Sequence, residues 1–263
     1  MRLCRESLEA VRAGASPVIG FWGAPPRAAL EAAAARFPGA AFYDLDVHHG
    51  ARESRTVPDA YCHIIRNCVD NALALGDRLL AVVAATGEEK CDAGRFAGRL
   101  VAELAGVEVI RTTNPGIDRP AEAALCDATG PLKARVVRIM EAIVEPLAPA
   151  ELEQARASRR EPTHGFWGTP PYPMAVLDLF PDATRVFGWT RCVERGRPAD
   201  LDLETEVPSD LPIVFFSQGF CAKSMLARRL AARHRGMHVD VHDSLGAATM
   251  AKIEAFLRLS ARG

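Results

Sequence analysis

The sequence of 263 residues lacks a strong charge of either sign, a long apolar run and the common nucleotide-binding motifs. Its net charge of −1 provides neither the basic excess of a nucleic-acid-binding protein nor an acidic tail. No stretch approaches the roughly 18 apolar residues that span a membrane, and the first residues contain no apolar signal core. We therefore expect a cytoplasmic protein that binds neither membranes nor nucleic acid.

Two absent motif types narrow the chemistry further. Neither Gly-x-Gly-x-x-Gly nor Gly-Lys-Ser/Thr occurs, so this chain is not expected to bind and hydrolyse ATP. No Cys-x-x-Cys pair occurs, which argues against structural zinc. Seven cysteines, an odd number in a long chain, do not form a secreted disulfide framework. The roles that remain for these cysteines are reduced thiols, catalytic groups and metal ligands.

The sequence does contain an internal repeat. Gly-Phe-Trp-Gly-Ala-Pro-Pro at 20–26 recurs as Gly-Phe-Trp-Gly-Thr-Pro-Pro at 165–171. A second repeated unit is an apolar strand, a loop, a cysteine and a helix, with Cys91 in the first half and Cys221 in the second. Each copy is predicted to run strand, helix, strand, variable connection, strand, cysteine helix, strand.

This alternation predicts an α/β protein with two pseudo-repeated Rossmann-like lobes, each a parallel sheet flanked by helices. The first lobe is expected at 1–148, and a long helix over 119–145 closes it. Residues 149–163 are polar and are expected to form a linker, and the second lobe is expected at 164–263. The other expected elements are strands at 17–22, 40–46, 79–85, 107–111, 184–189, 213–216 and 237–241, and helices at 27–36, 60–75 and 244–259.

The strongest candidates for chemistry are three cysteines. Cys91 and Cys221 follow buried strands and so fall at the carboxyl edge of a sheet, where α/β folds place their ligands. Both are expected to start helices, whose N-termini lower a thiol pKa. Cys62 is expected at another helix start, whereas Cys68 lies on a different helix face. Three thiolates from separate loops suit an iron–sulfur cluster, and the alternative is that free cysteines are small buried hydrophobes.

The remaining cysteines and several histidines give weaker signals. Cys4, Cys126 and Cys192 are interpreted as packing or surface residues. The pair His48 and His49 follows a strand at the carboxyl edge and is predicted to contact substrate as catalytic residues. His63 adjoins Cys62 and can donate a hydrogen bond to a cluster sulfur. His238, Asp240 and His242 alternate along one strand face, where a metal site is conceivable.

The two Gly-Phe-Trp-Gly loops allow two interpretations. Trp22, Gly23, Trp167 and Gly168 can bind a flat ligand or cofactor, because aromatic rings beside glycine suit such a ligand. Alternatively, the glycines permit a tight strand-to-helix turn while the tryptophans pack against the sheet.

Several stretches resemble the 2-hydroxyacyl-CoA dehydratase and benzoyl-CoA reductase family. Cys91-Asp-Ala-Gly-Arg95 resembles its Cys-Asp-x-x-Arg helix start, and Lys252-Ile-Glu-Ala-Phe256 is similar to its closing Arg-Ile-Glu-Ala-Phe helix. The helix expected after Pro26 and the position of Cys62 are also similar to the family pattern. The resemblance implies that Cys62, Cys91 and Cys221 ligate a [4Fe–4S] cluster that passes low-potential electrons to a thioester substrate. It also implies a homodimer or heterodimer with a related subunit, and a separate ATPase activator that acts as electron donor.

Two other functions remain open from the sequence. The first is a metal-free isomerase with two opposed cysteines, which resembles the aspartate/glutamate racemase group and explains the duplication. The second is a non-catalytic module that binds a small ligand or cofactor through the Gly-Phe-Trp-Gly loops.

Overall fold

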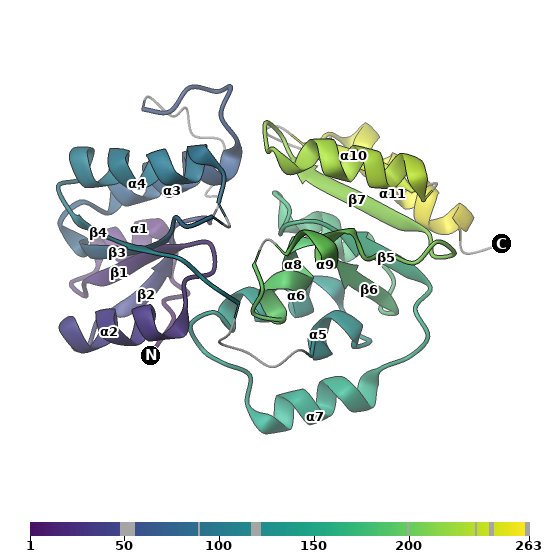
Figure 1. The fold of residues 1–263 in the computed structure, drawn as a ribbon, viewed down its shortest axis with the longest axis horizontal. Coiled ribbons are helices and arrows are strands. Elements are labelled where there is room, and N and C mark those ends of the chain that lie inside the picture. The colour runs from purple at the N-terminus through teal and green to yellow at the C-terminus, as the bar shows by residue number, and fades with distance from the viewer. Residues whose placement is uncertain are drawn as a thin grey trace. The chain divides into compact units, whose positions relative to one another are not determined.

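The computed structural model describes residues 1–47, 56–88, 90–116, 122–198, 200–234, 236–241 and 245–260. Contacts between residues divide the chain into two compact units. Unit 1 comprises Met1–Asp118 and Ile143–Glu145, and unit 2 comprises Arg119–Ala142 and Pro146–Gly263. Each unit contains one four-stranded sheet in which all neighbouring strands run parallel (Figure 1). The predicted α/β class with two lobes is therefore confirmed.

Unit 1 has the strand order β2-β1-β3-β4. The two central strands are apolar and almost entirely buried, as expected for a parallel sheet covered on both faces. Helices α3 and α4 cover one face of this sheet and α2 covers the other (Figure 1). The elements are α1 (Leu8–Ala13), β1 (Val18–Trp22), α2 (Arg27–Arg36), β2 (Ala41–Asp44), α3 (His63–Leu75), the 3-10 turn η1 (Gly76–Arg78), β3 (Leu79–Ala85), α4 (Asp92–Leu104) and β4 (Glu108–Thr112).

Unit 2 repeats the same topology in the order β6-β5-β7-β8. The sheet strands are β5 (His164–Trp167), β6 (Thr184–Phe187), β7 (Ile213–Gln218) and β8 (Met237–Val241). The helices are α5 (Ala124–Asp127), α6 (Leu132–Glu141), α7 (Pro149–Ser158), the 3-10 helix η2 (Met174–Leu179), α8 (Trp189–Glu194), α9 (Leu201–Thr205), α10 (Lys223–Arg233) and α11 (Ala247–Ser260). The equivalent strand order in both units supports the internal duplication.

The segment expected to form one long helix over 119–145 differs from that expectation. Its described part, 122–145, contains the helices α5 and α6, and Gly130 and Pro131 lie between them, where proline cannot continue a helix. Both helices belong to unit 2 rather than to the first lobe. The buried Arg135 of α6 explains this placement, because its guanidinium donates to backbone carbonyls of unit 2, including that of Thr184 in β6.

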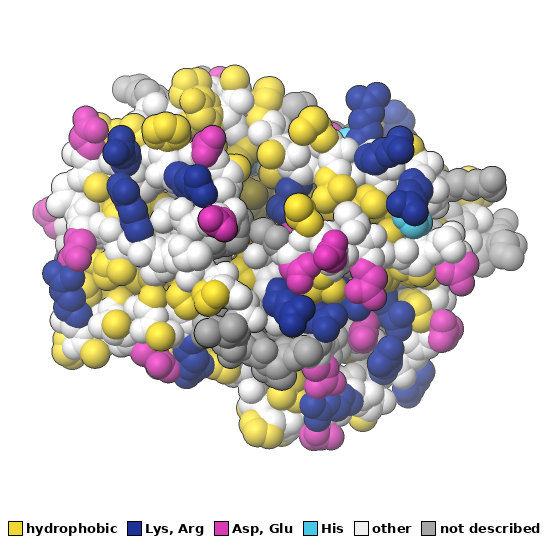
Figure 2. Space-filling view, in the orientation of Figure 1, with side chains coloured by type: hydrophobic (Ala, Val, Ile, Leu, Met, Phe, Trp, Pro, Cys, Tyr) yellow, Lys and Arg dark blue, Asp and Glu magenta, His cyan; other side chains and the backbone are white. Residues whose placement is uncertain are grey.

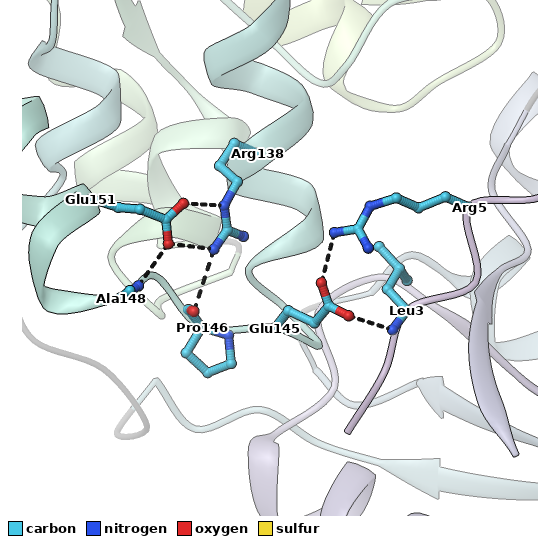
Figure 3. Close-up of polar contacts among 7 residues, drawn as sticks. All are labelled: Leu3, Arg5, Arg138, Glu145, Pro146, Ala148 and Glu151. Atoms are coloured by element: carbon cyan, nitrogen blue, oxygen red, sulfur yellow. Dashed lines mark hydrogen bonds and ion pairs between the residues drawn. The ribbon is translucent and has the colours of Figure 1, made fainter. Parts of the chain in front are cut away.

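The expected linker at 149–163 also contains a helix. Helix α7 begins at Pro149, and the carboxylate of Glu151 accepts hydrogen bonds from the backbone N–H of Ala148 and from the guanidinium of Arg138 (Figure 3). Proline is favourable in the first turn of a helix, and the acidic Glu151 suits the positive helix end. The boundary between the two compact units is therefore not a single polar linker.

A short segment just before α7 returns to unit 1. The carboxylate of Glu145 accepts hydrogen bonds from the backbone N–H of Leu3 at 2.7 Å and from the Arg5 guanidinium at 2.6 Å (Figure 3). These contacts explain why Ile143–Glu145 belongs with the amino-terminal residues. Within the described part of the chain, every helix is too short or too polar to cross a membrane.

Candidate functional site

The strand orders define an equivalent ligand-binding edge in each unit. In β2-β1-β3-β4 the chain passes from β1 to β2 on one side and from β3 to β4 on the other, so the strand order reverses between β1 and β3. Open α/β sheets bind their ligands at the carboxyl ends of the strands at such a point, which we call the crevice of the sheet. The loop after β1 begins with Gly23, and the loop after β3 leads to Cys91. In unit 2 the corresponding loops begin with Gly168 and lead to Cys221. The two repeated sequence motifs therefore flank the same crevice in each fold.

Unit 1 brings two predicted cysteines to neighbouring helix starts. Cys62 is the buried N-cap of α3, and Cys91 is the exposed N-cap of α4. The first turns of these helices pack together, since a Cβ on Gly94 of α4 would lie 3.8 Å from Cδ1 of Ile65 of α3. A helix N-terminus stabilises a nearby thiolate. Cys62 and Cys91 therefore lie at the starts of two helices that pack against each other.

Cys221 has a different local geometry. It is half-buried and lies one residue before the N-cap of α10, which is Ala222, so the expected helix start is displaced by the turn. The backbone N–H of Cys221 donates to the carbonyl oxygen of Gln218 at 3.0 Å. Phe220, directly before it, has φ of 60°, a left-handed conformation that is costly for a bulky residue and often marks functional turns.

The three cysteines are divided between the units, with Cys62 and Cys91 in unit 1 and Cys221 in unit 2. Among the residues that the structure describes, no three His, Cys, Asp or Glu side chains form a group that could hold a metal ion. Neither unit thus supplies a complete ligand set from its described residues.

Three other cysteines lie in the cores. Burial raises the pKa of the Cys68 thiol well above its usual value, and Asp46 and Asp44 add to the effect. Burial likewise raises the pKa of Cys126 well above its usual value and that of Cys192 to about 12. These thiols stay neutral near pH 7, as packing residues do.

The two tryptophans of the repeated loops are core residues. Trp22 is 2% exposed and Trp167 is 1% exposed, so neither ring offers an open face to a flat ligand. Gly168 has φ of 151°, and a Cβ there would lie 2.5 Å from the carbonyl oxygen of Phe216. Gly23, with φ of 72°, also has a backbone conformation that L-residues rarely adopt. These observations favour the interpretation of a tight turn with packed tryptophans.

An acidic and a basic residue that the sequence interpretation missed lie at the edge of unit 1. Asp44 ends β2, and burial raises the pKa of its carboxyl to about 6, although a hydrogen bond from the Asp46 N–H and the charge of Lys90 lower it. The Lys90 side chain passes over Gly23, where a Cβ would lie 2.6 Å from Nζ. Two features of the sequence could have pointed to these residues. Asp44 lies at the end of a predicted strand, and Lys90 directly precedes Cys91.

Unit 2 contains a buried ion pair at its equivalent edge. The fully buried carboxylate of Glu204 in α9 pairs through Oε1 with Nζ of Lys223, in the first turn of α10. The backbone oxygen of Glu204 accepts a 2.7 Å hydrogen bond from Nε1 of Trp167. Sequence reasoning missed this pair because Glu204 belongs to a charged stretch that resembles a surface excursion.

The polar residues of β8 form a hydrogen-bonded group with β7. Ser217 donates from Oγ to Oδ1 of Asp240 at 3.0 Å, and its oxygen lies 3.1 Å from Nε2 of His238. Because the hydroxyl hydrogen points to Asp240, Nε2 of His238 donates to the serine. Burial lowers the pKa of His238. His238 and Asp240 share one face as predicted, whereas His242 lies outside the described residues, as do His48 and His49.

A surface pocket of unit 2, of about 410 Å³, lies beside α8 and α9. Both basic and acidic side chains line it, and side chains of both signs lie on the exposed face over these helices (Figure 2). Its charged lining residues are Arg195, Arg197, Asp200, Asp202 and Glu206.

The fold and the repeated edges define a two-unit α/β protein with a cysteine beside the crevice of each parallel sheet. No protein-family model and no curated protein matches this chain.

Proposed function

We propose that the protein is an iron–sulfur reductase or dehydratase in which Cys62, Cys91 and Cys221 ligate a [4Fe–4S] cluster. The proposal rests chiefly on one observation, the occurrence of Cys91 and Cys221 after the third strand of two sheets with the same strand order. Duplication of a cysteine at a ligand-binding edge is unexpected for a thiol that only packs. Cys62, at the start of the helix beside α4, supplies the third sulfur.

When bound, the cluster supplies single electrons at low potential for a thioester substrate. Cys62 and Cys91 are the N-caps of α3 and α4, so each sulfur lies at the positive end of a helix, where an anionic cluster is favoured. Burial raises the pKa of Asp44 to about 6, so this carboxyl is mostly ionised at pH 7 and can accept a proton at the edge of unit 1. Trp22 and Trp167 support these loops from the core.

The proposal extends to location and partners. All seven cysteines lie in the described part of the chain and none forms a disulfide bond, which suits the reducing cytoplasm. A low-potential cluster needs an electron donor, and we propose that a separate ATPase activator supplies the electrons. We also propose that the protein forms a dimer with itself or with a related subunit.

Anaerobic reconstitution of the full chain with iron and sulfide tests the proposal. Because a [4Fe–4S] cluster contains four iron atoms, we expect about four iron atoms per chain. We also expect the broad visible absorption of an iron–sulfur centre. Cys62→Ser, Cys91→Ser and Cys221→Ser should each reduce the iron content and alter the electron paramagnetic resonance spectrum of the reduced protein. Cys4→Ser is the matched control, since Cys4 is a half-buried free thiol outside these edges.

A colourless protein after reconstitution would contradict the proposal. So would retention of the full iron content by all three variants at the proposed ligand positions.

A further inference from the structure

In unit 2, Glu204 of α9 contacts one residue from each of the two repeated segments that flank the crevice. Glu204 offers its backbone carbonyl oxygen to Nε1 of Trp167 and its side-chain carboxylate to Nζ of Lys223. Trp167 ends the first strand of the repeat, and Lys223 lies in the first turn of the helix after the third strand. Glu204 therefore provides an acceptor both for the indole N–H of Trp167 and for the ammonium group of Lys223.

Unit 1 has the equivalent tryptophan without the equivalent acceptor. Trp22 ends β1 as Trp167 ends β5. Both indoles also face the equivalent helix, since Cζ2 of Trp22 lies beside Gly98 of α4 and Trp167 packs in one cluster with Ala227 of α10. However, Nε1 of Trp22 is buried and has no hydrogen-bond partner among the described residues. A buried donor without an acceptor costs about 1–3 kcal/mol, so it indicates a position where an acceptor belongs.

The same crevice also has a lysine near the first turn of the equivalent helix. Lys90 lies over Gly23, and its chain passes close to Gly94 in the first turn of α4. Its ammonium group acts on Asp44 at the end of β2. An indole N–H and an ammonium group are therefore present at one edge, as they are in unit 2.

We propose that the crevice of unit 1 binds a small dicarboxylic acid, which takes the place that Glu204 occupies in unit 2. One carboxylate accepts from Nε1 of Trp22, and the other pairs with Nζ of Lys90 beside Asp44. The carbonyl carbon and the side-chain carboxylate carbon of a glutamate residue are separated by three carbons, which is the spacing in glutarate. The inference concerns donors of unit 1 alone and does not depend on the proposed cluster.

Nuclear magnetic resonance of the ¹⁵N-labelled full chain, purified without added iron, tests this binding directly. The chain has three tryptophans, so three indole N–H signals are expected, and single Trp→Phe variants assign them. On titration with glutarate the Trp22 signal should move and saturate, while the Trp167 signal stays in place because Glu204 already occupies its acceptor position. Pentanoate, which has the same chain length but one carboxylate, should produce a much weaker effect.

Variants measured by calorimetry give a second readout. Trp22→Phe and Lys90→Met should each weaken glutarate binding by about tenfold, the loss expected for one hydrogen bond to a charged group. Trp167→Phe and Lys252→Met, an exposed lysine of α11, should leave the affinity unchanged. A Trp22 signal that does not move at millimolar glutarate, or that moves equally with pentanoate, would overturn the proposal. Loss of affinity in the control variants would overturn it as well.

Discussion

The guanidinium of Arg135 donates a 2.6 Å hydrogen bond to the carbonyl oxygen of Thr184, the first residue of β6. The same side chain also donates to the carbonyl oxygens of Leu125 and Gly130. Arg135 thus connects α5, α6 and the central sheet of unit 2. Its contacts explain why residues 124–141 belong to this unit.

Arg135→Met should lower the free energy of unfolding of the protein by at least about 3 kcal/mol, because several carbonyl groups lose their buried donor. Arg138→Met, on the same helix, is the matched control. Its ion pair with Glu151 is partly exposed and should contribute about 1 kcal/mol or less. Urea unfolding of the two variants measures the difference, and equal losses would contradict the assigned role.

Lys223→Met should lower the free energy of unfolding by about 3–5 kcal/mol, since it leaves the buried carboxylate of Glu204 without its cation. The double variant Lys223→Met/Glu204→Gln should recover part of this loss. Lys133→Met removes an exposed ion pair with Asp178 and should cost at most about 1 kcal/mol. Thermal unfolding of all three proteins tests the prediction, which fails if the double variant is no more stable than Lys223→Met.

Gly168→Ala should destabilise the protein by about 3 kcal/mol or more, because the new Cβ would lie 2.5 Å from the Phe216 carbonyl oxygen. Gly39→Ala provides the comparison. Gly39 also has a positive φ of 85°, but a Cβ there would meet no atom within 4 Å, so only backbone strain of roughly 1–2 kcal/mol is expected. Chemical denaturation distinguishes the steric contribution from the strain, and similar losses at both sites would argue against the close contact.

Asp44→Asn should change how stability depends on pH. Burial raises the pKa of Asp44 in the folded state from its ordinary 3.8 to about 6, so folding favours the protonated carboxyl. The protonated Asp44 contributes fully to the free energy of unfolding below about pH 4. This contribution is lost as the pH rises to about 6, and the total loss is about 3 kcal/mol. At pH 7 the asparagine variant should therefore be more stable than the wild type.

The exposed Asp77→Asn variant of the same unit is the control and should follow the wild-type pH profile. Unfolding measured between pH 4 and pH 8 makes the comparison. An Asp44→Asn profile parallel to that of the wild type would show that burial does not raise the pKa of the Asp44 carboxyl.

Local patterns predicted the repeated framework well. The apolar run at 79–85 forms β3 over these residues, and the alanine-rich stretch at 27–36 forms α2, because each pattern agrees with its tertiary surroundings. The fold class followed from the alternation of such segments. The positions of Cys91 and Cys221 after strands also followed, although Cys221 lies one residue before the N-cap of α10.

Long-range polar contacts could not be predicted in the same way. The assignment of α5 and α6 to unit 2 depends on Arg135, whose partner Thr184 is 49 residues away along the chain. Glu204 appears in the sequence as one of several charges in a solvated stretch, and only tertiary structure shows that it is fully buried. The role of Asp44 likewise depends on burial that a strand-end aspartate does not reveal by itself.

The contact between Glu145 and the amino-terminal residues has a consequence for protein engineering. The polypeptide leaves unit 1 after residue 118, returns for Ile143–Glu145 and leaves again, so neither unit is a single continuous stretch of chain. Splitting the gene at one codon therefore cannot produce both halves intact. Separate expression of the amino-terminal half requires a circularly permuted or fused design that keeps the Glu145 carboxylate beside the N–H of Leu3.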